Sequence, residues 1–399
     1  MDNTFLAKRL ERVNESATIA MAKKAREIAA QGHDVISLSL GQPDFDTPDH
    51  VKEAAKTALD NGYTNYTPVG GHPEFVEAII SKFKRDNDLE FTKENIVVSC
   101  GAKQSINNLM NALVDPGDEV IIFTPYWVSY FDIVTMVGGV PVCLKAGIEN
   151  DFKVTPSQLE SALTDKTKVI IFSSPCNPTG SVYDRAELLE LAKVIDNKGD
   201  VLVISDEIYE YINFGEKHAS IGSFDFMRDK VATVNGMAKG FAMTGWRIGY
   251  MGAPKWLAKA CTAIQSQVTS GAASFSQKAS AVAISSDMGP TEEMKKAFLK
   301  RKQIMIDGLQ SIEGIKTNNP KGAFYIFPDV SSFFGKSNGE ITINNSNDFA
   351  LELLNNAHVA TVAGSAFGDE NSIRLSYAAS DEELKEALRR MKTFLSTFK

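Results

Sequence analysis

Short apolar runs alternate with longer helical patterns from about residue 50 to residue 295. The clearest runs, rich in β-branched residues and typical of buried strands, are residues 96–99, 120–123, 169–172 and 201–204. After Gly101 the pattern changes, and apolar side chains recur at a helical spacing: Ile106, Leu109, Met110 and Leu113. Strands that alternate with helices predict an α/β fold with a mostly parallel central sheet and flanking helices.

The C-terminal part of the chain carries a second, smaller pattern. Apolar residues 323–327 and 373–375 indicate strands, and a final helix is expected from Asp381. Residues 329–348 between them are mostly polar, so we interpret them as a surface insertion without catalytic chemistry. This pattern predicts a smaller α/β unit beside the main sheet.

Composition narrows the class of protein without identifying it. The 399 residues are 43% hydrophobic, which is enough for two or more domains with large cores. A formal net charge of −8 argues against nucleic acid as a partner. No apolar run is long enough to span a membrane, and the N-terminus does not resemble a signal peptide. The four cysteines and five histidines show no metal-ligand spacing, so we expect a cytoplasmic chain without a metal site.

The segment from residue 235 to residue 250 carries the most informative chemistry. Lys239 lies eight residues before Arg247, and the small residues Gly240, Ala242 and Gly245 lie between them. A lysine amine can form a Schiff base with an aldehyde, and an arginine can hold a phosphate through two parallel hydrogen bonds. Pyridoxal phosphate is both an aldehyde and a phosphate. Alternatively, Lys239 is a solvated surface lysine and Arg247 is unrelated to it. Further segments of the sequence are needed to distinguish a cofactor site from this alternative.

Two strand ends offer partners for the ring of such a cofactor. Asp206 follows the apolar run 201–204, and a buried carboxylate there would pair with a protonated pyridine nitrogen. Tyr209 could reach the same ligand if the chain turns helically. Asn177 lies in a Pro- and Gly-rich turn after residues 169–172, where its amide could bond the phenolic oxygen. Alternatively, Asp206 caps a helix and Asn177 only shapes a turn.

A third strand end predicts an anion site. Gly101 and Ala102 join residues 96–99 to a helix, whose first N–H groups can bind phosphate, and Lys103 adds a donor. Trp127 follows residues 120–123 and could stack on a flat ring, although core packing is the more common role of a tryptophan.

These segments together resemble a known family. The chain is similar to the class I pyridoxal phosphate aminotransferases, and most similar to the aspartate aminotransferases of the bacterial and plastid subgroup that includes prephenate aminotransferases. The resemblance extends from about residue 5 to the C-terminus. The ordered motifs are Gly101-Ala-Lys-Gln, Pro125-Tyr-Trp-Val-Ser-Tyr, Ser174-Pro-Cys-Asn-Pro-Thr-Gly, Ser205-Asp-Glu-Ile-Tyr, Ala238-Lys, Met243-Thr-Gly-Trp-Arg-Ile-Gly-Tyr and Ile373-Arg-Leu-Ser-Tyr.

The resemblance implies the fold-type I architecture of pyridoxal phosphate-dependent transferases. A large cofactor-binding domain would span residues 48–295. A small domain would combine residues 1–47 and 296–399, with the polar insertion at about 329–348. The family resemblance also implies a homodimer with shared active sites, in which Tyr66 reaches the phosphate in the neighbouring subunit.

The resemblance also assigns roles around the cofactor. Lys239 would bind the aldehyde and then move the proton, while Asp206 would pair with the ring nitrogen. Asn177 and Tyr209 would bond the phenolic oxygen, and Trp127 would stack on the ring. The remaining roles are phosphate binding by Gly101, Ala102, Lys103 and Arg247, and binding of the substrate α-carboxylate by Arg374 with Gly41 beside it. One position departs from many relatives, because Ala238 replaces a serine that donates to the phosphate.

The implied activity is reversible, ping-pong transfer of the amino group from L-aspartate to 2-oxoglutarate. Prephenate, aromatic amino acids and alanine remain alternative substrates. A cofactor-binding regulator without turnover is a different class, against which the lack of a basic extension argues. Ser16, Thr18 and Lys103 are candidates for binding the distal carboxylate of aspartate.

Overall fold

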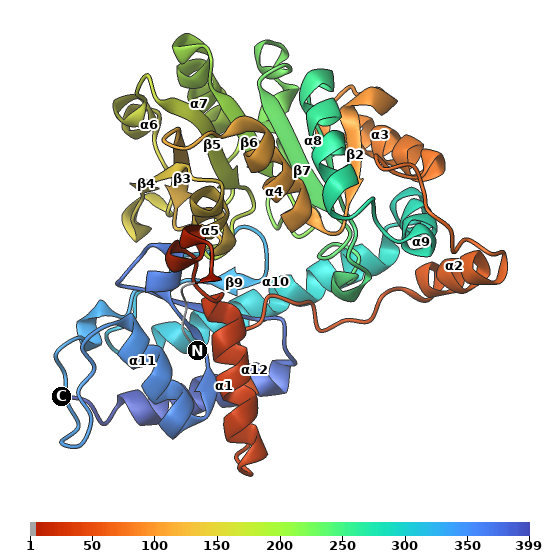
Figure 1. Cartoon of the computed structure of the whole chain (residues 1–399). Helices are drawn as coiled ribbons and strands as arrows, with labels where there is room; N and C mark the ends of the chain where they lie inside the picture. Colours follow the sequence, from red (N-terminus) through yellow and green to blue (C-terminus); the bar gives the residue numbers. More distant parts are fainter. Residues whose placement is uncertain (1–4) are drawn as a thin grey trace.

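The central element of the fold is a seven-stranded sheet in the order β2-β8-β7-β6-β5-β3-β4 (Figure 1). Its strands are β2 (Ile96–Ser99), β3 (Glu119–Thr124), β4 (Val140–Lys145), β5 (Thr167–Ser173), β6 (Leu202–Asp206), β7 (Val231–Gly236) and β8 (Gly249–Gly252). The computed structural model describes residues 5–399. β8 pairs antiparallel with β2 and β7, whereas the other pairs are parallel. The predicted mostly parallel sheet is confirmed, and the four predicted runs are β2, β3, β5 and β6.

The central strands are apolar throughout because helices cover both faces of the sheet. Along β5, Val169 and Ile171 pack in one cluster while Ile170 and Phe172 pack in another, as the two-residue period of a strand requires. The first cluster joins the sheet to α4 (Ala102–Leu113), α5 (Ser129–Met136) and α8 (Lys255–Val268). The second joins it to α6 (Pro156–Ala162) and α7 (Arg185–Lys198).

A third group of helices packs at the end of the sheet formed by β2 and β8. α2 (Asp49–Asp60), α3 (Pro73–Asn87) and α9 (Ser274–Ser285) form one cluster with β2 and β8. The long helix α10 (Gly289–Gln310) then runs along the junction with the rest of the molecule (Figure 1). Its residues Phe298, Met305 and Leu309 belong to the core of the smaller part.

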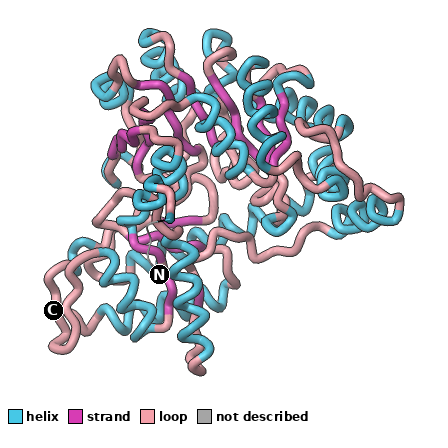
Figure 2. Tube along the Cα trace, in the orientation of Figure 1, coloured by secondary structure: helices cyan, strands magenta, loops and turns pink. Residues whose placement is uncertain are grey.

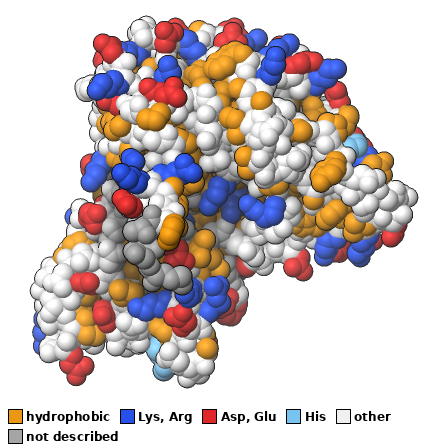
Figure 3. Space-filling view, in the orientation of Figure 1, with side chains coloured by type: hydrophobic (Ala, Val, Ile, Leu, Met, Phe, Trp, Pro, Cys, Tyr) orange, Lys and Arg blue, Asp and Glu red, His pale blue; other side chains and the backbone are white. Residues whose placement is uncertain are grey.

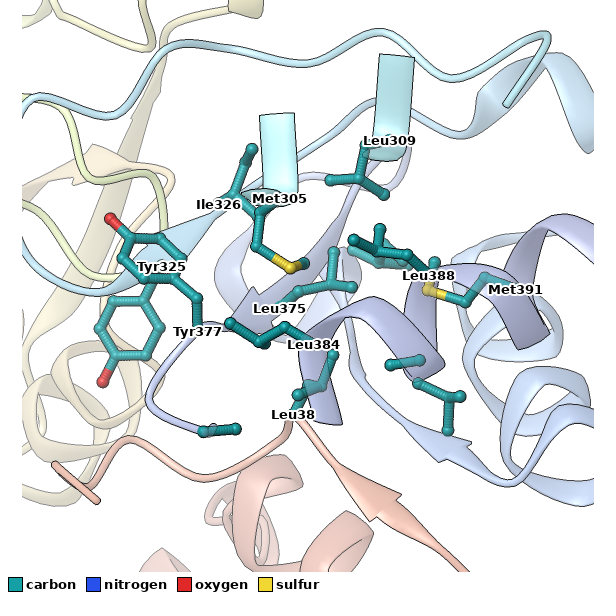
Figure 4. Packing of buried hydrophobic residues seen from close by; sticks show 14 of the residues in the cluster. Leu38, Met305, Leu309, Tyr325, Ile326, Leu375, Tyr377, Leu384, Leu388 and Met391 are labelled. Carbon is teal, nitrogen blue, oxygen red and sulfur yellow. The ribbon is translucent and has the colours of Figure 1, made fainter. Parts of the chain in front are cut away.

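The smaller part contains two short sheets with their own helices, and Figure 2 shows these strands apart from the main sheet. β11 (Val362–Ala363), β12 (Ile373–Ser376) and β9 (Tyr325–Ile326) form an antiparallel sheet, and β1 (Ile36–Ser37) pairs with β10 (Val359–Ala360). The helices are α1 (Ala17–Ala30), α11 (Ser346–Glu352) and α12 (Asp381–Leu395). Figure 4 shows how Leu38, Met305, Leu375 and Leu388 bring segments far apart in sequence into one core.

Three details differ from the sequence prediction. β4, β7 and β8 have no counterpart among the predicted runs, and in β8 Gly249 and Gly252 interrupt the apolar pattern. The strand predicted over residues 323–327 is only Tyr325–Ile326. The stretch 329–348 is not wholly at the surface, since Val330 and Phe333 are buried in the core of the smaller part. The expected domain boundary at residue 295 falls within α10 and stays a prediction, and residues 1–4 of the expected small domain lie outside the described residues.

Candidate active site

A cleft of about 290 Å³ lies between the two parts, at the carboxyl ends of the central strands. This is the edge of an open α/β sheet at which ligands bind. Lys and Arg side chains gather along the junction between the two parts in the space-filling view (Figure 3). Every residue expected to bind the cofactor or the substrate lines this cleft, with the single exception of Tyr66. Ser16 and Thr18 line it too, with their hydroxyl oxygens 2.8 Å apart.

Lys239 lies on the turn after β7, inside the cleft. Its Nζ donates a hydrogen bond to the backbone oxygen of Gly41, and no carboxylate is among its hydrogen-bond or ion-pair partners in residues 5–399. Burial, helped by the guanidinium groups of Arg374 and Arg247, lowers the pKa of Lys239 to about 8. A substantial fraction of this amine is therefore neutral and nucleophilic near neutral pH.

Asp206 is the last residue of β6 and is buried. Its Oδ2 accepts a hydrogen bond from the Tyr130 hydroxyl at 2.6 Å, and its Oδ1 accepts one from the backbone N–H of Ile208 at 3.2 Å. Burial raises its pKa to about 6 despite the bond from Tyr130. The segment after Asp206 is a turn without a helix, so the alternative of a helix cap is wrong. The carboxylate has no cation in contact within the described chain.

Arg374 comes from β12 and is only 1% exposed. Its Nη1 donates to Asn177 Oδ1 at 2.9 Å, and its Nη2 donates to the backbone oxygen of Ser39 at 2.5 Å. Its Nε has no hydrogen-bond partner, and no carboxylate pairs with the group among residues 5–399. The guanidinium lies over the rings of Tyr325 and Phe367, at 4.6 and 4.9 Å from the ring centroids. A buried cation without an anion is suited to bind an anionic ligand.

Asn177 and Tyr209 lie at adjacent strand ends, after β5 and β6. Because Asn177 uses its amide oxygen to accept from Arg374, its NH₂ group is free to donate to a ligand. The hydroxyl of Tyr209 lies 2.7 Å from the hydroxyl of Tyr325. Sequence reasoning placed Asn177 and Tyr209 beside one ligand, and the structure brings both to the same cleft.

The predicted anion site lies at the start of α4. Gly101 precedes the helix with a φ of +85°, and a Cβ on it would lie 2.6 Å from Arg247 Nη2. Only glycine therefore lets the arginine approach the free N–H groups of the helix. Lys103 was expected to bind the phosphate with these groups. Its Nζ lies over the Trp127 ring instead, 4.9 Å from the ring centroid. Burial, together with the neighbouring Arg247, lowers the pKa of Lys103.

Tyr66 is the one predicted residue outside the cleft. Its side chain is 96% exposed, and it lines a separate hollow with Tyr63 and His72. A single chain therefore leaves Tyr66 away from its own cleft, and its role toward a neighbouring subunit stays a prediction.

Sequence reasoning missed Tyr130 and Tyr325. Tyr130 stands in a quoted motif three residues after Trp127, so the helical turn of α5 could have suggested its position. Tyr325 lies in an apolar run where an aromatic residue is ordinarily a core residue, and nothing in that local pattern marks its hydroxyl.

Comparisons with known proteins agree with this geometry. Residues 33–391 match the family model for aminotransferases of class I and II. The chain is 45% identical to an aspartate/prephenate aminotransferase of Cereibacter sphaeroides, with 98% of each protein covered. It is 44% identical to an aspartate aminotransferase of Geobacillus stearothermophilus, again with 98% of each covered.

Solved structures give the same result. The aspartate aminotransferase from Rhizobium meliloti matches with a TM-score of 0.96 at 40% identity, covering 99% of both chains. The Thermus thermophilus aspartate aminotransferase with maleate matches with a TM-score of 0.92 at 40% identity, covering 97% of this chain and 99% of that one. No helix within residues 5–399 is both long and apolar enough to cross a membrane. The fold, the cleft and these matches show that the chain belongs to the class I and II aminotransferase family.

Proposed function

We propose that the chain is a pyridoxal 5′-phosphate-dependent aspartate aminotransferase that transfers the amino group of L-aspartate to 2-oxoglutarate. The observation that carries this proposal is one cleft with three ionisable groups that have no counter-ion in contact among residues 5–399. They are the Asp206 carboxylate, the Lys239 amine and the Arg374 guanidinium. Buried charges without partners are costly, so such a set indicates a site completed by a ligand.

The cleft fits the proposed cofactor group by group. Gly101, whose absent Cβ makes room for Arg247, would bind the phosphate together with Ala102 and the start of α4. The free NH₂ of Asn177 and the Tyr209 hydroxyl would bond the phenolic oxygen, and the unpaired Asp206 would pair with the ring nitrogen. When bound, the cofactor supplies an electrophilic carbon and a ring that withdraws electrons from the substrate.

The protein's own residues then account for the proton transfer. Lys239, with a pKa of about 8, can take the proton from the substrate Cα and return it to another carbon. Arg374 fixes the substrate because its unpaired Nε adds to the donors available for an α-carboxylate. Tyr130 donates to Asp206 and keeps that carboxylate oriented. The roles assigned to Lys239, Asp206 and Arg374 from sequence remain part of this proposal.

The distal carboxylate of aspartate requires a second cationic or hydroxyl-rich region. Lys103 lies at the cleft over Trp127, and the hydroxyls of Ser16 and Thr18 line the same cleft. We assign the distal carboxylate to this group, since Arg247 and the start of α4 are available for the phosphate. The Thermus thermophilus relative was solved with maleate, which is a dicarboxylate. Prephenate is the second candidate substrate, because it also carries two carboxylates and the relatives' names include it.

The test is a panel of amino donors and keto acceptors with Lys103→Ala and with the exposed control Lys84→Ala. Aspartate should be the best donor, and 2-oxoglutarate should serve as an acceptor. Lys103→Ala should lower kcat/KM for aspartate and prephenate about tenfold more than for alanine or phenylalanine. An unchanged aspartate-to-alanine ratio would instead assign Lys103 to the phosphate. A chromophore that aspartate does not alter would favour the non-catalytic regulator.

We further propose a homodimer with shared sites, supported by the 96% exposure of Tyr66 outside its own cleft. Mixing inactive Tyr66→Ala and Lys239→Ala chains should restore about a quarter of the sites, because random exchange pairs intact residues at one site per hybrid. No recovery after demonstrated subunit exchange would mean that each chain builds its own site. The four free thiols agree with a cytoplasmic location, which cell fractionation would test.

A further inference from the structure

The side chain of Tyr325 contacts three of the proposed site residues: Tyr209, Arg374 and Gly41. It lies on β9 in the smaller part and is fully buried. Its hydroxyl is 2.7 Å from that of Tyr209, and its ring lies under the Arg374 guanidinium at 4.6 Å. A Cβ placed on Gly41 would lie 2.2 Å from the Tyr325 hydroxyl. Residues that belong to both the cofactor and the substrate regions therefore meet at this phenol.

In the hydrogen bond between Tyr325 and Tyr209, either hydroxyl could be the donor. Each phenol carries one hydrogen, and one of the two hydrogens must occupy the bond between them. If Tyr209 donated to Tyr325, it would have no hydrogen left for the phenolic oxygen of the cofactor. If Tyr325 donates, the Tyr209 hydrogen is free to point into the cleft.

The surroundings of the two phenols favour Tyr325 as the donor. The guanidinium of Arg374 over its ring stabilises negative charge on Tyr325 and strengthens its O–H as a donor. Burial raises the pKa of both phenols. The Arg374 guanidinium lowers the pKa of both phenols, and it lies directly over the ring of Tyr325. Tyr325 is therefore the more acidic partner.

We propose that Tyr325 is a positioning residue: its hydroxyl donates to Tyr209 and turns the single Tyr209 hydrogen toward the cofactor's phenolic oxygen. This inference rests on the proposed function and adds a residue to the site. It also joins two roles, because β9 pairs with β12, which carries Arg374. The phenol that lies against the substrate arginine thus orders the donor used by the cofactor.

A double-mutant cycle on the full-length protein tests this inference. The variants are Tyr325→Phe, Tyr209→Phe and both together, with Tyr377→Phe as the matched control. Tyr377 is another fully buried tyrosine of the smaller part, and its hydroxyl donates to the Ala323 oxygen at 3.3 Å. The readouts are the equilibrium dissociation constant of the apoprotein for pyridoxal 5′-phosphate and the pH at which the bound chromophore changes its absorption.

Tyr325→Phe should weaken cofactor binding about five- to tenfold, as expected for the loss of one ordered hydrogen bond. In the Tyr209→Phe background the same change should have less than about a twofold effect, because the residue acts through Tyr209. The chromophore transition should shift in Tyr325→Phe and stay unchanged in Tyr377→Phe. Independent, multiplicative effects, or a Tyr325→Phe result equal to the control, would overturn the inference.

The wild-type protein separates this inference from the proposed function. If wild type fails to bind the cofactor, the proposed function fails. If wild type binds the cofactor but the double-mutant cycle shows no coupling between Tyr325 and Tyr209, the proposed function stands and only the role of Tyr325 is wrong. Circular dichroism and the denaturation midpoint of each apoprotein identify a folding defect. Should Tyr325→Phe not fold, the NMR signal of the Tyr209 hydroxyl hydrogen in the cofactor-bound wild type still tests the direction of the bond. If that hydrogen is donated to Tyr325, the inference is overturned.

Discussion

Two buried regions of the molecule contain charged side chains, and they differ in whether those charges have partners within the protein. One is the cleft, where Asp206, Lys239 and Arg374 have no ion-pair partner within the described part of the chain. The other begins at the next residue, Glu207, and is buried except for the half-buried His218. Glu207 accepts hydrogen bonds from Asn87 at 3.0 Å, from Ser220 at 2.5 Å and from Ser205 at 2.9 Å, and it pairs with His218 at 2.9 Å.

The internal region also contains an ion pair that water does not reach. Lys82 is fully buried and pairs with Glu210, while Asn87 donates to the second carboxylate oxygen of Glu210 at 2.8 Å. His218 lowers the pKa of Glu207 against the effect of burial. The carboxylates of Glu207 and Glu210 lie close to His218, in a geometry that could hold a metal ion. Lys82 and Asn87 satisfy the carboxylates from within the protein.

This contrast shows which buried charges are available to bind a ligand. When a buried charge has a complete set of partners, removing one partner destabilises the protein. A buried charge without partners costs stability until a ligand supplies the counter-charge. Substitutions in the two regions should therefore have opposite effects on stability and activity.

The largest expected effect on catalysis comes from Asp206→Asn. Turnover should fall about a thousandfold, because an amide cannot keep the cofactor ring protonated and a buried charge pair is worth roughly 3–5 kcal/mol. Apoprotein stability should increase, since an unpaired carboxylate is removed. Because folding raises the Asp206 pKa from 3.8 to about 6, this gain should grow between those pH values and remain constant above them. Urea denaturation against pH and steady-state kinetics measure both effects, and near-normal turnover would contradict the assignment.

In the internal region, Lys82→Met should have the reverse profile. The variant leaves Glu210 buried without its cation, so the free energy of unfolding should fall by about 3–5 kcal/mol. The double variant Lys82→Met with Glu210→Gln should recover much of this loss. Turnover per folded molecule should change less than about threefold. A Lys82→Met protein as stable as wild type would mean that the two regions do not differ in the way described.

Within the cleft, Arg374→Lys separates the effect of the positive charge from that of the paired hydrogen-bond donors. The charge is kept while the fork of parallel donors is lost, so kcat/KM should fall about a hundredfold for every amino acid substrate. Arg389→Lys, which alters an exposed arginine paired with Glu386, is the control and should leave kcat/KM unchanged. If only dicarboxylic donors were affected, Arg374 would bind the distal carboxylate instead of the α-carboxylate.

The smallest effect concerns the pH dependence of cofactor association. The Lys239 amine must be neutral to attack the aldehyde, and its pKa is lowered from 10.5 to about 8. The association rate with the apoprotein should therefore rise with pH and level off above about 8. Stopped-flow absorbance measures this rate, and N-acetyl-lysine serves as the reference amine. A rate that keeps rising toward pH 10 in parallel with the reference would show that the cleft does not depress this pKa.

Much of the site could be predicted because the residues that carry it stand directly after strands. The runs before Gly101, Trp127, Asn177 and Asp206 are uninterrupted and apolar, and parallel strands bring their carboxyl ends to one edge. The final helix from Asp381 was predicted at its true start, since Ser380 and Glu383 form a capping box there.

The remainder depended on contacts between distant segments. The antiparallel strand β8 follows from its pairing with β2 and β7, because Gly249 and Gly252 give it no apolar alternation of its own. The Tyr209–Tyr325 bond joins residues 116 positions apart, and no local pattern indicates which buried tyrosine will provide it. Lys103 similarly lies over Trp127 because of how α4 and the segment after β3 meet.

The most direct measurement is borohydride reduction of the protein loaded with pyridoxal 5′-phosphate, followed by peptide mapping. It asks whether the uncompensated amine of the cleft is the group that binds the cofactor aldehyde. One pyridoxyl label per chain is expected, on Lys239. Lys239→Ala should take no label, keep its fold and lose transamination. A label on Lys103 or on any other lysine, or a wild-type protein that takes no label, would contradict the account.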